Sequence, residues 1–101
     1  MASSTVLVSA EARRELLALY DWIETDSSAV RAEMVLQRIE HVLDLVAAMP
    51  GIGRERADLD GQPHVISVGP WIVFYDELPD DEGIVVLHVV DGRRNLENLN
   101  L

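Results

Sequence analysis

The spacing of the apolar residues changes near the middle of the chain, and this change limits what the chain can fold into. Before Pro50 and Gly51, apolar residues recur every three or four positions, the repeat of one helical face. After Pro63, short runs rich in β-branched residues are separated by Gly and Pro, which is typical of strands. A helical first half followed by a β second half predicts an α+β domain.

Two helices are expected in the first half of the chain. The first covers about residues 10–25, with Ser9 as its N-cap. The second runs to about Met49 and has the clearest periodicity in the sequence, with Arg38 off its apolar face. The polar residues 26–28 separate the two helices, which predicts an antiparallel helical hairpin. The apolar face of the second helix comprises Ala32, Val35, Leu36, Ile39, Val42, Leu43 and Val46.

Four strands are expected to form a mainly antiparallel sheet in a two-layer domain of order β-α-α-β-β-β that occupies residues 1–101. The helical hairpin covers one face of this sheet. The fourth strand is the most apolar, so it is expected to lie centrally, with a binding partner covering its other face. The strands are residues 5–9, 64–68, 71–76 and 84–90, with a long loop over 50–63 and a hairpin turn over 79–83.

The composition excludes several classes of site. The chain has no Cys, which rules out disulfides, thiolate zinc sites and Cys nucleophiles. It carries 8 cationic residues, all Arg, and 18 acidic ones, for a formal charge of −10. That charge disfavours direct binding to nucleic acid. Nucleotide-binding and hydrolase motifs, a spaced metal-ligand set, a leader and a membrane-length apolar run are also missing from the sequence, so we expect no cofactor, no metal and no membrane contact.

Several strings of residues, taken together and in their order along the chain, resemble the ParE branch of the RelE/ParE toxins. They span nearly the whole sequence. They are Ser9-Ala10-Glu11-Ala12, Leu16, Tyr20-Asp21-Trp22-Ile23, Met49-Pro50-Gly51-Ile52-Gly53-Arg54, Val68-Gly69, Val73-Phe74-Tyr75 and Val89-Val90-Asp91-Gly92-Arg93-Arg94-Asn95-Leu96.

This resemblance implies a cytoplasmic toxin of a type II toxin–antitoxin system, the kind associated with plasmid stabilization. Such a toxin is neutralised by a ParD-like antitoxin, and ParE-like members inhibit DNA gyrase. RelE-like members share the fold but cut messenger RNA on the ribosome, so an endoribonuclease is the alternative. A third hypothesis is a degenerate, non-toxic homologue, because four positions that are often basic in the family are His64, Asp76, His88 and Asp91 here. The sequence is compatible with a homodimer and with a hetero-oligomer containing the antitoxin.

The endoribonuclease hypothesis needs an acid, a base and a cation in one place. His64, His88 and Tyr75 are the candidate acids and bases, and Arg93 or Arg56 the candidate cation. Strand alternation puts Val86, His88 and Val90 on one face and Leu87 and Val89 on the other, so His88 is expected to share a face with His64. The competing interpretation, which we favour, is that both are ordinary strand histidines paired with acidic neighbours.

The candidate protein-binding residues are one tryptophan and four arginines. Trp22 lies off the main apolar stripe of its helix and is expected to be exposed. Arg93 and Arg94 follow the last strand, where they contact a target or antitoxin, or else form a salt bridge to Glu97 or a loop acid. Arg54 and Arg56 lie in the long loop, where pairing with Asp58 or Asp60 is favoured over catalysis.

For the aromatic residues Trp71, Phe74 and Tyr75, core packing is the expectation, with Trp71 and Tyr75 on one face and Phe74 on the other.

Overall fold

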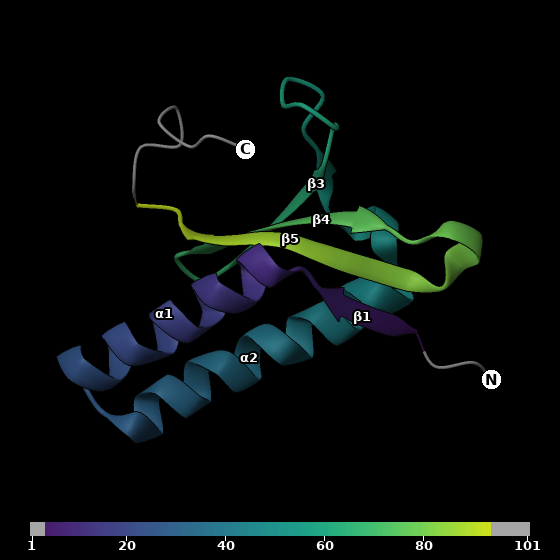
Figure 1. Ribbon diagram of the computed structural model, residues 1–101. Coiled ribbons are helices and arrows are strands. Elements are labelled where there is room, and N and C mark those ends of the chain that lie inside the picture. Colours follow the sequence, from purple (N-terminus) through teal and green to yellow (C-terminus); the bar gives the residue numbers. More distant parts are fainter. Residues whose placement is uncertain (1–3, 94–101) are drawn as a thin grey trace.

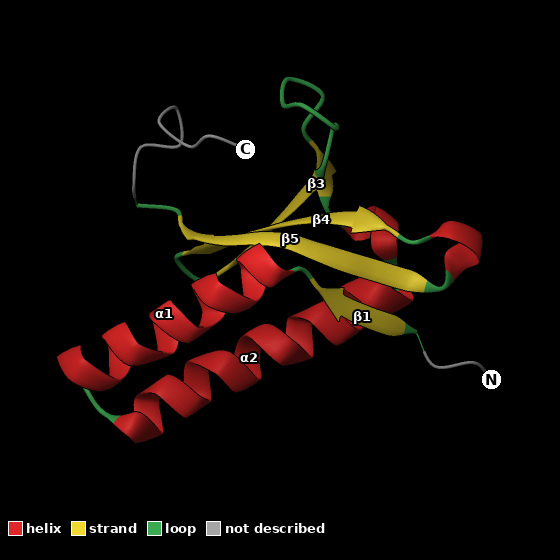
Figure 2. Ribbon diagram, in the orientation of Figure 1, coloured by secondary structure: helices red, strands yellow, loops and turns green. Residues whose placement is uncertain are grey.

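The computed structural model describes residues 4–93, which form a five-stranded sheet covered on one face by two helices (Figure 1). The elements are β1 (Thr5–Val8), α1 (Ala10–Asp26), α2 (Ala29–Ala48), β2 (Arg54–Glu55), β3 (His64–Val68), β4 (Trp71–Glu77) and β5 (Gly83–Asp91), with short 3₁₀ turns at Pro50–Ile52 and Pro79–Asp81. The strand order is β1-β5-β4-β3-β2, with β1 parallel to β5 and all other pairs antiparallel. The predicted α+β architecture, with a helical hairpin on one face of a mainly antiparallel sheet, is confirmed (Figure 2).

The sheet contains one strand more than the four predicted. The segment 50–63, expected to be a loop, includes β2, whose Arg54 and Glu55 pair with Val65 and His64 of β3. Both β2 residues are exposed and polar, so this strand has no apolar alternation by which a sequence would reveal it.

Serine side chains start both helices. The Ser9 hydroxyl accepts a hydrogen bond from the backbone N–H of Ala12 (3.1 Å), and the Ser28 hydroxyl accepts one from Arg31 (3.1 Å). Each serine thereby satisfies one of the N–H groups that lack a partner in the first turn of a helix. The predicted Ser9 cap is confirmed. Ser9 also donates to the carbonyl of Leu87 (3.0 Å), which fixes the start of α1 against β5.

The core lies between the helical hairpin and one face of the sheet. From β4, it receives the side chains of Trp71, Val73 and Tyr75, while Phe74 points to the opposite face, as strand alternation predicts. All three aromatic residues predicted to pack in the interior are buried. The hairpin contributes Ala12, Ile23, Ala32, Ile39, Leu43, Val46 and Ala47, and the remaining strands contribute Val68, Ile84, Val86 and Val89.

A β-bulge in β5 changes which of its side chains face the core. Phe74 of β4 pairs with His88, but the next residue, Tyr75, pairs with Val86, so Leu87 is an extra residue in β5. Val86 and Val89 consequently both face the helices. The prediction of a regular alternation, with Val89 on the face opposite Val86, was therefore wrong. The prediction of a central strand is closer: β5 is flanked on both sides, although β4 is the middle strand.

The outer edge of β5 continues past the end of β1, and α1 lies along it. The backbone N–H of Ser9 donates to the carbonyl of Val86 (2.9 Å), and the Glu15 carboxylate accepts a hydrogen bond from the N–H of Val89 (3.0 Å). A carboxylate from a helix thus satisfies a backbone donor that strand pairing would otherwise leave open. Across residues 4–93, neither helix is long and apolar enough to cross a membrane.

Candidate protein-binding site

Tyr75, one of the candidate acids, holds the backbone of the loop that follows α2. Its hydroxyl donates to the carbonyl of Pro50 (2.6 Å) and accepts a hydrogen bond from the N–H of Gly53 (3.0 Å). Burial is the main cause that raises the pKa of this phenol above its usual value, and the Gly53 hydrogen bond opposes the rise. A hydroxyl that already bonds two backbone groups is placed for a structural role.

The two candidate histidines lie on opposite faces of the sheet. His64 pairs with Tyr75 across the strands and stacks on its ring, with ring centroids 5.3 Å apart. His88 pairs with Phe74, whose side chain faces the other way, and meets that ring edge-on at 6.4 Å. The expectation that His64 and His88 share a face was therefore wrong, and the bulge in β5 is the physical reason.

Each histidine has an acidic neighbour, as the favoured interpretation predicts. Nδ1 of His88 lies 3.3 Å from the Glu15 carboxylate, and Nε2 of His64 lies 3.9 Å from that of Glu77. Nδ1 of His64 is buried without a hydrogen-bond partner among the described residues. The candidate cations lie elsewhere: Arg56 pairs with a loop acid, and Arg93 lies beyond Asp91, which faces Trp71 at the far end of β4 from Tyr75.

Arg54 and Arg56 do not join Trp22 in one site. The Arg56 guanidinium makes two hydrogen bonds to Asp58 (2.8 and 2.7 Å), which confirms the predicted loop ion pair. That hydrogen-bonded pair lowers the pKa of Asp58 to about 2. Arg54 is exposed on β2, and Arg94 lies outside the described residues.

Trp22, Trp71 and Arg93 come together at one end of the sheet. Trp22 projects from α1 with 51% of its surface exposed, as predicted, and its ring meets that of the buried Trp71 edge-on at 6.4 Å. The Arg93 guanidinium lies 5.9 Å from the Trp22 ring and 5.7 Å from the Trp71 ring, within cation–π range. Asp91 holds it there through hydrogen bonds of 2.9 and 2.8 Å. We refer to Trp22 and Trp71 as the tryptophan pair.

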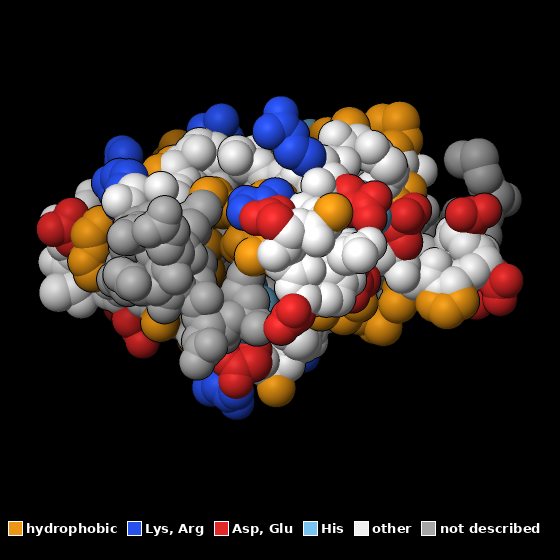
Figure 3. All heavy atoms as spheres, turned by 90° about the horizontal axis from the view of Figure 1, so that it is seen from above, with side chains coloured by type: hydrophobic (Ala, Val, Ile, Leu, Met, Phe, Trp, Pro, Cys, Tyr) orange, Lys and Arg blue, Asp and Glu red, His pale blue; other side chains and the backbone are white. Residues whose placement is uncertain are grey.

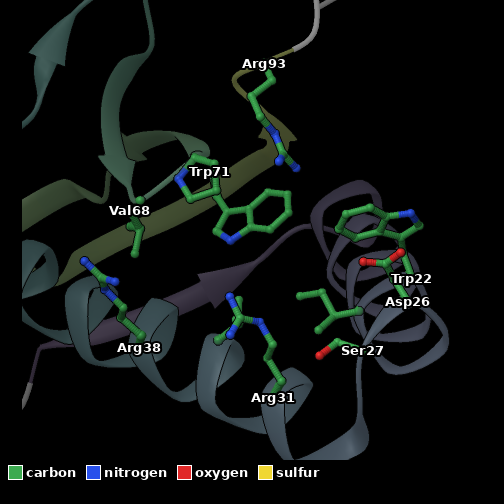
Figure 4. Close-up of a pocket in the computed structure, with 12 residues that line it drawn as sticks. Trp22, Asp26, Ser27, Arg31, Arg38, Val68, Trp71 and Arg93 are labelled. Carbon is green, nitrogen blue, oxygen red and sulfur yellow. The ribbon is translucent and has the colours of Figure 1, made fainter.

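A cavity of about 310 Å³ opens beside the tryptophan pair, and we call it the arginine pocket. Arg31 and Arg38 of α2 line it together with Arg93, which follows β5; in Figure 4, Arg31 points toward Trp71 and Arg38 toward Val68. Apolar side chains from α1, α2, the end of β3 and the β3–β4 turn complete the wall; they include Ile23, Val35, Val68 and Pro70.

The sequence gives only a weak signal for Arg31 and Arg38. They are seven residues apart, two helical turns, so they occupy the same side of α2. Both lie outside the apolar face of α2, so the sequence pattern predicts only that they are exposed to solvent. Only the packing of the β3–β4 turn over this side of α2 makes them line a cavity with Trp71.

A second cavity, of about 370 Å³, lies against the same tryptophan pair. Its wall is formed by Glu15, Ala18 and Leu19 of α1 and by Val89, Val90 and Asp91 of β5. The two cavities share Trp22 and Trp71, so the exposed indole of Trp22 stands between two hollows. Exposed aromatic side chains of this kind are frequent anchors in protein–protein interfaces.

Comparison with known proteins identifies the family of the chain. Toxin ParE3 of Caulobacter vibrioides is 42% identical over 65 residues, which cover 64% of this chain and 63% of that protein, so the match spans less than two thirds of the relative's length. A chain in the solved structure of the chromosomal ParDE TA system from P. aeruginosa has the same fold, with a TM-score of 0.72 at 15% identity over 88% of this chain and 96% of that one. The family model for the ParE toxin of type II toxin–antitoxin systems matches residues 6–96. The chain therefore belongs to the ParE toxin family.

Proposed function

We propose that this ParE-family chain acts in the cytoplasm by binding DNA gyrase and is neutralised by a ParD-like antitoxin. The observation that carries the binding mechanism is the position of His64 and His88 on opposite faces of the sheet, away from Arg93. Cleavage of RNA would require such groups to converge on one phosphodiester. The tryptophan pair, flanked by two cavities, offers a surface suited to a protein partner instead.

The charge of the chain also favours a protein target. A formal charge of −10 repels ribosomal RNA at long range, whereas a protein partner can present complementary charge. In the view of Figure 3, the arginines lie at the left and centre, interspersed with acidic side chains, and further acidic side chains occupy the right-hand end, where β4 turns into β5. The chain therefore has an uneven surface that a protein partner can match.

A supercoiling assay with purified gyrase tests the proposed target. We expect the purified chain to inhibit supercoiling at micromolar concentration, and we expect Trp22→Ala to weaken the inhibition, because Trp22 is the exposed anchor. Leu17→Ala is the matched control, since Leu17 is an exposed apolar residue of the same helix that lines neither cavity. No inhibition by the wild-type chain would count heavily against the gyrase proposal.

Expression in bacteria tests neutralisation and separates the remaining hypotheses. We expect the chain alone to arrest growth, and co-expression of a short reading frame from beside its gene to restore growth. Uninterrupted growth would favour the degenerate homologue. Growth arrest accompanied by cleavage of messages in purified translating ribosomes would favour the endoribonuclease, and His64→Ala or His88→Ala should then abolish that cleavage.

A further inference from the structure

Three of the eight arginines of this strongly acidic chain line one cavity. We propose that the arginine pocket binds the carboxylate of an aspartate or glutamate in a protein partner, beside an apolar side chain that packs on the tryptophan pair. This inference rests on the proposed function only in taking the partner to be a protein.

The three arginines that line the pocket differ in whether they form an ion pair. Arg93 is held by Asp91, so its positive charge is largely balanced within the chain. Neither Arg31 nor Arg38 has an ion-pair partner within residues 4–93, although both line the cavity; Figure 4 shows Arg31 directed toward Trp71 and Arg38 directed toward Val68. Asp26, at the end of α1, is the acidic residue in the lining. Two unpaired guanidinium groups beside one carboxylate leave the pocket with an excess of positive charge, which a partner's carboxylate would neutralise through charge-assisted hydrogen bonds.

The apolar part of the wall favours a peptide over a free phosphate or a nucleic acid. Val35, Val68 and Pro70 offer carbon surface beside the guanidinium groups, where an amino-acid side chain gains contact and a phosphate does not. A nucleic acid would also bring many further negative charges toward a chain that already carries −10.

The second cavity indicates how the occupant continues past the pocket. Its wall is mainly apolar, and its Glu15 carboxylate already bonds the N–H of Val89. A segment with its acidic residue at Arg31 can therefore cross Trp22 and bury an apolar side chain against Leu19 and Val89. The charge order thus orients the bound segment, because its acidic end fits only the arginine pocket.

Tryptophan fluorescence of the full chain tests this site directly, because its two tryptophans are the tryptophan pair itself. The probe is a capped Leu-Glu-Leu peptide, and the matched probe is capped Leu-Gln-Leu. We expect the Glu peptide to change the fluorescence with saturation at about millimolar concentration and to bind about tenfold tighter than the Gln peptide. No saturation by the Glu peptide, or equal binding of the two peptides, would overturn the proposal.

Variants and inorganic phosphate complete the test. Arg31→Gln and Arg38→Gln should each weaken binding of the Glu peptide about tenfold. Both side chains are exposed, so the fold should be retained, and circular dichroism checks this. Arg13→Gln, at an exposed position of α1 outside both cavities, should leave the binding unchanged. An equal loss with Arg13→Gln, or tighter binding of inorganic phosphate than of the Glu peptide, would contradict a carboxylate site. Gyrase and antitoxin are both omitted, so the outcome is independent of the supercoiling result.

Discussion

Tyr75 connects the sheet to the loop after α2 through a single oxygen atom. Its ring is fully buried, while its hydroxyl reaches two backbone groups more than twenty residues away in sequence. Gly53 lies so close that a Cβ at that position would approach the hydroxyl to 2.3 Å. The glycine and the tyrosine therefore depend on each other, and the loop conformation depends on both.

Removing this hydroxyl should destabilise the fold. We expect Tyr75→Phe to lower the free energy of unfolding by about 1–3 kcal/mol, because the carbonyl of Pro50 and the N–H of Gly53 lose their partner. Urea denaturation measures the change. Tyr20→Phe is the control, since the Tyr20 hydroxyl makes no hydrogen bond within the described residues, and an equal loss there would contradict the explanation.

The same residue makes stability depend on alkaline pH. Burial raises the pKa of Tyr75 above its usual value of 10, so the folded state favours the protonated phenol. Its contribution is complete below pH 10 and is lost as the pH rises from 10 through the pKa of the folded state. Unfolding followed across this range should show a steeper alkaline loss for the wild type than for Tyr75→Phe. Parallel pH profiles would indicate that this phenol titrates as it does in the unfolded chain.

Arg56 and Asp58 form an exposed ion pair whose effect can be followed by titration. The Arg56 hydrogen bonds lower the pKa of Asp58 from 3.8 to about 2, so the interaction is present above pH 3.8 and disappears as the pH falls through 2. In Arg56→Gln, the pKa of Asp58 should return toward 3.8, as measured by NMR titration of the carboxyl carbon. Arg14→Gln, which breaks a different exposed pair, should leave it unchanged. Stability should change little in either variant, because both pairs are exposed.

At the scale of secondary structure, the order of the elements follows from the sequence, but the local register does not. The steps of three and four residues locate both helices, and Ser9 marks the start of the first. The bulge in β5 was missed because Ile-Val-Val-Leu-His-Val-Val is apolar at nearly every position, so an inserted residue leaves no break in the pattern. That single residue decides which face His88 occupies, and so whether His88 lies on the same face as His64.

The candidate binding residues also differ in how far the sequence alone predicts their contacts. The exposure of Trp22 follows from its position off the apolar stripe, and the Arg56 ion pair follows from nearby acids in the loop. The partnership of Arg93 with Trp71 depends on the pairing of β4 with β5, which joins residues far apart in sequence. Single-element reasoning cannot supply such contacts.

The first residue of β5 is the glycine whose replacement the fold should tolerate least. Gly83 has φ +139°, and a Cβ there would lie 1.9 Å from the carbonyl oxygen of Thr5. We expect Gly83→Ala to cost at least about 1–3 kcal/mol from backbone strain alone, with the clash against β1 adding to it. Thermal unfolding measures the loss. Gly51→Ala, where nothing lies within 4 Å, should be close to neutral, and equal losses would contradict the packing explanation.

At the scale of the whole molecule, charge acts in two ways at different distances. We expect the overall −10 to attract from afar an antitoxin segment with exposed Arg or Lys, whereas the arginine pocket is proposed to select an acidic side chain at contact. A partner with mixed charge satisfies both requirements. The net charge therefore predicts how fast such a partner associates, and the pocket predicts where on the surface it binds.

Salt separates these two effects. We expect the association rate with the antitoxin to fall as salt rises, because screening weakens the long-range attraction. Stopped-flow mixing measures this rate. Arg31→Gln should mainly speed dissociation and leave the dependence of association on salt nearly intact. An association rate that does not change with salt would show that the overall charge does not guide the encounter.

The parallel pairing of β1 with β5 has a consequence for synthesis of the chain. The strand β1 pairs only with β5, so during translation this pairing can form only after residues 83–91 have been synthesised. Trp22 emerges early, but the wall that Val89 and Asp91 provide for it is made late. The surface around the tryptophan pair can therefore form only after residues 83–91 have emerged from the ribosome.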